Sequence, residues 1–162
     1  MDSYKSSLEA YTVLIKTLTE ESTVEEILKG FVKGLNSIGY YSVTLGRIDK
    51  SSGEWTPVFV SCENEEVVNY IQKVRIKLPK GLPTQKGSVG WAYYTKEPYI
   101  IEDVLQHPGT KPWYDFYFLF GIKSSASIPI LIEGEVEYVI VIHDRKRCGK
   151  QRTARDTKIN RS

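Results

Sequence analysis

A pair of apolar segments near the end of the chain limits the possible folds more than any other part of the sequence. Residues 122–132 and 136–143 are rich in β-branched and aliphatic side chains, and the short segment Glu133-Gly134-Glu135 separates them. Two such segments around a tight turn predict an antiparallel hairpin. Because this hairpin is the most apolar part of the chain, we expect it to lie at the centre of a sheet.

The rest of the chain alternates helical and extended patterns. Thr23 and Glu26 form a capping-box pattern in front of an apolar stripe that ends near Gly39. Ser88 is a candidate N-cap of a later helix. The order predicts an α+β fold, a mostly antiparallel sheet with helices packed on it. Helices are predicted at 4–20, 24–38, 63–73 and from 88; strands at 41–48, 54–61, 74–78 and 98–102; and a long connection at 103–121.

Length and composition are those of one ordinary globular domain. The chain has 162 residues, of which 41% are hydrophobic and 26% charged. No apolar run is long enough to cross a bilayer, and the first residues do not have the pattern of a signal peptide. With only two cysteines, we expect a reducing, cytoplasmic location.

The net charge of +2 combines two unlike parts. Residues 144–162 carry +6, and the remaining 143 residues carry −4. A mildly acidic body is not typical of a nucleic-acid binder. We therefore predict a folded domain over 1–143 and a basic tail over 144–162.

Several familiar catalytic patterns are incomplete. Residues 81–88 read GLPTQKGS, in which Lys86 and Gly87 are transposed relative to a phosphate-binding P-loop. A helix that starts at Ser88 still offers an N-terminus that attracts anions. The two histidines and two cysteines lack zinc-ligand spacing, so no metal site is predicted. No G-x-S-x-G element accompanies Asp103 and His107, so a serine triad is not expected either.

Aromatic residues are concentrated in one part of the chain. Ten of the 19 aromatic residues fall between positions 91 and 120. Trp and Tyr side chains suit a ligand cavity, because they combine an apolar face with a polar atom. They suit an ordinary core beneath a long connection equally well. The sequence leaves both interpretations open.

Three segments together resemble a GAF domain. They read KGSVGWAYYTKEPYIIEDV, HPGTKPWYD and GIKSSASIPILIEGEVEYVIVIH, and the resemblance covers about residues 5–143. It implies the PAS/GAF superfold, with a central six-stranded antiparallel sheet, helices packed on it and a small-molecule pocket in front. Matching the motifs one by one implies these pocket residues: Trp91, Asp103, Trp113, Tyr117, Ser125 and Ser127.

Departures from the family pattern reduce the range of ligands that we expect. No cysteine lies in 103–121, so a covalent bilin is not expected there, and the cyclic-nucleotide signature N-K-x-x-x-F-x-x-x-D-E is absent. His107 alone is weak support for haem. Cys62 and Cys148 do not match the cysteines of the family's methionine sulfoxide reductases. Tyr138 stands where a glycine is usual. The cofactor, if one binds, stays unknown.

The largest departure is the tail, which lacks the long amphipathic helix that normally follows the last strand. We favour a truncated or frame-shifted end, or a remnant of the expressed gene, over a disordered basic arm that contacts acidic partners.

The resemblance implies a non-enzymatic bacterial sensor. It would bind a small molecule, form a homodimer through its N-terminal helices and relay binding to an output domain such as a histidine kinase or diguanylate cyclase, with neither membrane nor nucleic acid as partner. The alternatives are a ligand-free dimerisation module and, third, a methionine sulfoxide reductase.

Overall fold

One antiparallel sheet forms the centre of the molecule. The computed structural model describes residues 5, 7–9 and 21–146. The elements in this part of the chain are α2 (Glu21–Ser37), β1 (Ser42–Asp49), β2 (Glu54–Ser61), α3 (Glu65–Gln72), β3 (Ile76–Lys77), α4 (Gly87–Thr95), β4 (Tyr99–Ile101), the 3-10 helix η1 (Pro108–Trp113), α5 (Tyr114–Phe120), β5 (Ser124–Ile132) and β6 (Glu135–Asp144).

The strand order is β3-β2-β1-β6-β5-β4, and every neighbouring pair is antiparallel. β1 and β6 are the two innermost strands, and β5 lies beside β6. The predicted six-stranded antiparallel sheet with the last hairpin at its centre is therefore confirmed. Glu133 and Gly134 both have positive φ, at 53° and 82°, which is the backbone of a tight two-residue hairpin turn.

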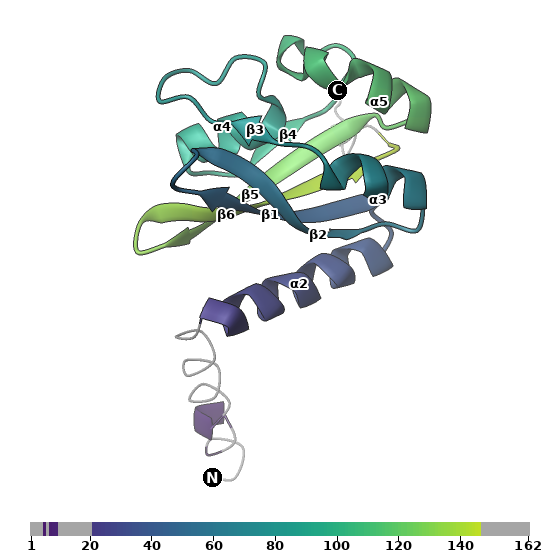
Figure 1. Cartoon of the computed structure of the whole chain (residues 1–162). Helices are drawn as coiled ribbons and strands as arrows, with labels where there is room; N and C mark the ends of the chain where they lie inside the picture. Colours follow the sequence, from purple (N-terminus) through teal and green to yellow (C-terminus); the bar gives the residue numbers. More distant parts are fainter. Residues whose placement is uncertain (1–4, 6, 10–20, 147–162) are drawn as a thin grey trace, which may run out of the picture.

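Helices cover both faces of the sheet (Figure 1). α2 covers one face, here called the rear face, which is the lower face in Figure 1. On this face Val32 packs with Val43, Leu45 and Ile140, all of them 0% exposed. α3, α4 and α5 lie over the opposite face, here called the front face, which is the upper face in Figure 1. Alternation along each strand sends consecutive side chains to opposite faces, so β1 and β6 contribute to both layers.

The front face is polar at its centre, which is unusual for a buried surface. Ser42, His143 and Ser125 lie side by side in one cross-strand row, and Thr44, Val141 and Ser127 lie in the next. The polar members of both rows are at most 8% exposed. These buried hydroxyls and the imidazole need hydrogen-bond partners, which makes this face the natural place for a site.

Three local predictions are wrong. Thr23 lies inside α2, which includes residues from Glu21 onward, so it does not cap that helix. Ser88 is the second residue of α4 and makes no capping bond. Residues 103–121, predicted as a long connection without helices of its own, contain η1 and α5. Periodicity misses these elements because one contains two prolines and the other has only seven residues.

Tyr138, which stands at a usual glycine position, is accommodated on the rear face. It is 4% exposed and packs in the core beneath α2, and its hydroxyl lies 3.3 Å from Oε1 of Glu25. Most of the predicted helix at 4–20 and of the tail lies outside the described residues. In the part of the chain that the structure describes, no helix is long and apolar enough to span a membrane.

Candidate ligand-binding site

A cavity of about 40 Å³ lies between the front face of the sheet and the helices above it. One water needs only about 10–15 Å³ of such space, so this cavity has room for a molecule of several atoms. It is lined by Thr44, Trp55, Tyr70, Ile71, Val74, Ile76, Lys86, Gly87, Ser88, Val89, Trp113, Phe116, Tyr117, Ser125, Val141 and His143.

The floor of the cavity contains two polar atoms that are buried without a partner. Thr44 is 0% exposed and His143 is 8% exposed. Neither Oγ1 of Thr44 nor Nδ1 of His143 has a hydrogen-bond partner within residues 5, 7–9 and 21–146, and the same holds for Oγ of Ser42 beside His143. Leaving such a group buried and unpaired costs about 1–3 kcal/mol. A molecule in the cavity would remove that cost.

Three serine hydroxyls form a chain beside these groups. Ser88 Oγ lies 2.9 Å from Ser125 Oγ and 2.7 Å from Ser127 Oγ. Ser125 and Ser127 point to the same face of β5, and Ser88 meets them from the first turn of α4. Three hydroxyl protons serve two hydrogen bonds, so one proton remains for another acceptor.

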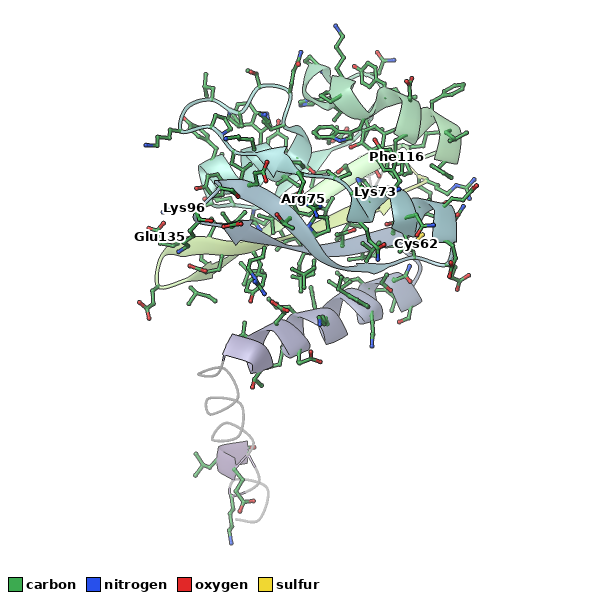
Figure 2. All side chains as sticks on the ribbon, in the orientation of Figure 1. Cys62, Lys73, Arg75, Lys96, Phe116 and Glu135 are labelled. Atoms are coloured by element: carbon green, nitrogen blue, oxygen red, sulfur yellow. The ribbon has the colours of Figure 1, made fainter. Side chains whose placement is uncertain are left out.

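Aromatic rings close the cavity above and at one end. Phe116 stacks on Tyr70 with 4.1 Å between ring centroids, which joins α5 to α3. Figure 2 shows Phe116 above the sheet, in the layer of α3 and α5. Trp113 packs on Gly87, where a β-carbon would lie 3.2 Å from its ring. Trp55 is 2% exposed, and its Nε1–H donates to the carbonyl of Val139 at 3.1 Å.

Burial controls the ionisation of the groups in the cavity. It lowers the pKa of His143 to about 4, because removal from water disfavours the imidazolium. Burial also raises the pKa of Tyr117, with a smaller contribution from Tyr70. At neutral pH both groups are therefore uncharged. Among the lining residues, all of which the structure describes, Lys86 is the one that carries a charge.

Comparison with the sequence profiles of known families identifies the family of this chain. The profile of the GAF domain family matches residues 17–156. The chain belongs to the GAF domain family. No curated protein matches this GAF domain in sequence.

Solved structures share the fold at low sequence identity. The GAF domain/HD domain protein of Geobacter sulfurreducens is 12% identical with a TM-score of 0.61, over 84% of this chain and 83% of that one. The GAF domain of a phosphoenolpyruvate-protein phosphotransferase from Coxiella burnetii is 23% identical with a TM-score of 0.56, over 78% and 71%. The free methionine-R-sulfoxide reductase of Neisseria meningitidis is 16% identical with a TM-score of 0.54, over 74% and 62%.

The structure brings together some of the residues that sequence reasoning assigned to the pocket of this GAF domain. Trp113, Tyr117 and Ser125 line the cavity, and Ser127 lies directly behind it, bonded to Ser88. The rings leave the cavity open rather than filling it.

Trp91 and Asp103 lie elsewhere. Trp91 stacks on Tyr99 at 5.7 Å and is not a lining residue. Asp103 borders a separate surface depression near Lys123 and Arg145, and its carboxylate accepts the backbone N–H of Leu105.

Most lining residues were not predicted from the sequence, and these include Thr44, Trp55, Ser88 in its hydroxyl role, and His143. A signal was present, since Ser42 and Thr44 interrupt an apolar strand at alternate positions and His143 ends another. No group of three or more metal-ligating side chains occurs in the part of the chain described by the structure. Cys62 lies beyond the end of β2 and does not line the cavity (Figure 2).

Proposed function

We propose that this GAF domain is a non-enzymatic sensory module that binds a small molecule in the cavity between β1, β5, β6 and α4. One observation carries the proposal: Thr44 and His143 line a hollow, and Oγ1 of Thr44 and Nδ1 of His143 are buried with no hydrogen-bond partner in residues 5, 7–9 and 21–146. A core under selection for stability alone would fill this space or pair these atoms. A ligand supplies the missing partners.

The same two strands connect the cavity to α2. β1 and β6 present Thr44 and His143 to the ligand on the front face. On the rear face they present Arg47 and Tyr138, and both of these side chains contact the carboxylate of Glu25 in α2. In the proposal, occupation of the cavity shifts these strands and α2 together, which passes the signal to an output domain such as a histidine kinase or diguanylate cyclase.

An exposed apolar stripe on α2 supports a homodimer as part of the same proposal. Ile27 and Phe31 of α2 are 37% and 50% exposed, and Ile38, directly after the helix, is 74% exposed. Ile27 and Phe31 are four residues apart, which places them along one stripe of the helix. This stripe lies next to the side of α2 that packs on the sheet through Val32. A second copy of α2 would cover it. We place the dimer in the cytoplasm.

The reductase alternative requires a cysteine at the ligand. Cys62 packs against the cluster around Val67 rather than on the cavity, and Cys148 lies outside the described residues. Replacing both cysteines by serine would leave ligand binding intact in a sensor. The same change would abolish methionine sulfoxide reduction if the alternative held.

A thermal-shift screen tests the proposal on the full chain. The panel contains nucleotides, haem, bilins, amino acids and organic acids. A compound that binds the folded protein raises the melting temperature by an amount that grows with the ratio of its concentration to its Kd. Val141→Leu adds a methylene group to the cavity wall and should abolish the shift. Val43→Leu adds the same group to the rear face and should keep it. If neither a compound of this panel nor an inorganic oxyanion raises the melting temperature, the sensor proposal fails.

A further inference from the structure

The loop that leads into α4 has an uncommon backbone. φ alternates in sign over three successive residues, +58° at Gln85, −113° at Lys86 and +63° at Gly87. Such alternation turns successive N–H groups toward one side, where they form a concave site for an anion. A positive φ at a residue other than glycine is uncommon, so Gln85 marks this loop as specialised.

The N–H groups of the first turn of α4 are next to this loop. α4 has nine residues, and the N–H groups at its start have no acceptor within the helix. They carry partial positive charge and favour an anion. Lys86, Gly87, Ser88 and Val89 all line the cavity, so this positive end of the helix faces the candidate ligand site.

The other walls contribute hydroxyl groups that can donate a hydrogen bond. Thr44 is 0% exposed and its Oγ1 is unpaired within the described chain, so its proton needs an acceptor. The serine chain leaves one further hydroxyl proton, and two of its three members, Ser88 and Ser125, line the cavity. No Asp or Glu occurs among the lining residues, which all belong to the described part, and the one charged member is Lys86.

We propose that the ligand of this cavity is a small monovalent oxyanion, held by the N–H groups at the start of α4 and by the hydroxyls of Thr44 and Ser125. The inference rests on the proposed function and narrows it to a ligand class. One lysine and one helix end match a single negative charge. A cavity of about 40 Å³ matches a planar group of three or four non-hydrogen atoms, from a short carboxylic acid or an inorganic oxyanion.

Isosteric pairs of compounds separate charge from shape. We would titrate the full chain with acetate and acetamide, with formate and formamide, and with nitrate as the inorganic oxyanion, at constant ionic strength set with sodium chloride. The readout is the melting temperature and the calorimetric Kd. The inference predicts that at least one oxyanion binds at least tenfold more tightly than its neutral isostere.

Neighbouring serines provide the variant and its control. Ser125→Ala removes a hydroxyl from the cavity, whereas Ser124→Ala removes one from the opposite face of the same strand, where its Oγ donates to the carbonyl of Lys146. Ser125→Ala should weaken binding of the oxyanion about tenfold, a loss in the range of one hydrogen bond to a charged group, and Ser124→Ala should not. Lys86→Gln should weaken the oxyanion and leave the neutral isostere unaffected.

Each outcome decides between the two proposals. If acetamide or formamide binds as well as its oxyanion, the anion inference is overturned while the sensor function stands. If the panel of the thermal-shift screen yields a ligand but none of these oxyanions binds, the inference is likewise overturned. If neither panel yields a ligand, both proposals fail. Binding of nitrate without the carboxylates would identify the inorganic source, and the reverse pattern would identify an organic acid.

Discussion

The indole of Trp55 lies directly over Gly46. A β-carbon on residue 46 would be 2.1 Å from Cε2 of Trp55, which is far inside van der Waals contact. The absence of a side chain at this position lets the ring lie flat on the sheet and donate its Nε1–H to Val139. The ring in this position closes one end of the cavity.

We expect Gly46→Ala to destabilise the protein by about 2–3 kcal/mol, because Trp55 must move and lose its hydrogen bond. Chemical unfolding followed by tryptophan fluorescence measures this loss. Gly30→Ala is the matched control, since a β-carbon there meets nothing within 4 Å. In the interior of α2 that change should stabilise by about 0.5–1 kcal/mol. Equal effects of the two changes would contradict the role assigned to Gly46.

Thr44→Val should stabilise the ligand-free protein by about 1 kcal/mol, because it replaces an unpaired buried hydroxyl by a methyl group. The same change should weaken ligand binding. Thr110 is the control, because it is also 0% exposed but its Oγ1 donates to the carbonyl groups of Val104 and His107. Thr110→Val should therefore cost about 1–3 kcal/mol. A Thr44→Val variant that loses as much stability would show that Thr44 already has a partner.

The free energy of unfolding should decrease as the pH is lowered, because His143 is held uncharged in the folded protein. Its pKa is about 4 in the folded protein and about 6.5 when unfolded, so the unfolded chain binds more protons between these values. The contribution of neutral His143 to the unfolding free energy is therefore complete above pH 6.5. It decreases by about 1 kcal/mol per pH unit down to pH 4. The rings of Phe116 and Tyr117 pack against the imidazole, and Lys86 and Tyr70 line the same cavity.

His143→Gln isolates this effect. Urea unfolding at pH 7, 6, 5 and 4 gives the difference in unfolding free energy between wild type and variant, in which every other titrating group cancels to first order. We expect the difference to change by about 3 kcal/mol over this range. A difference that stays constant with pH would show that His143 titrates normally in the folded state.

The exposed stripe on α2 should govern association. Phe31 is 50% exposed, so Phe31→Ser should shift the full chain from dimer to monomer in multi-angle light scattering without lowering its melting temperature by more than a few degrees. Phe118→Ser is the control, since Phe118 is 79% exposed on α5, on the other side of the sheet. A wild-type protein that is monomeric at all concentrations would exclude the dimer.

Sequence reasoning reached the architecture because its signals are local or repeated. The apolar hairpin and the motif order predict the central strands, and alternation places Ser125 and Ser127 on one face of β5. The residues at the floor of the cavity could not be predicted from the sequence. His143 and Thr44 join one site only through the pairing of β1 with β6, in which Ser42 lies opposite His143. No local pattern specifies a register between segments about a hundred residues apart.

Trp91 is a residue that was predicted to line the pocket but lies outside it. Its motif position suggests the pocket, yet α4 turns it toward Tyr99 and turns Ser88 toward the cavity instead. The hydrophobic character of α4 has almost no preferred side, so its rotation is decided by tertiary packing rather than by periodicity. The helix-end chemistry at Lys86 to Ser88 was visible as a motif, but the backbone that gives it a concave shape was not.

An NMR titration shows directly whether the cavity between the sheet and α4 binds a small ligand. Backbone amides of Gly87, Ser88 and Val89 and the imidazole of His143 are followed as each compound of the two panels is added, with Gly134 in the distant hairpin turn as internal control. We expect saturable shifts of these signals with at least one compound, and none at Gly134. Absence of a saturable shift with every compound, or shifts confined to other surfaces, would contradict this expectation.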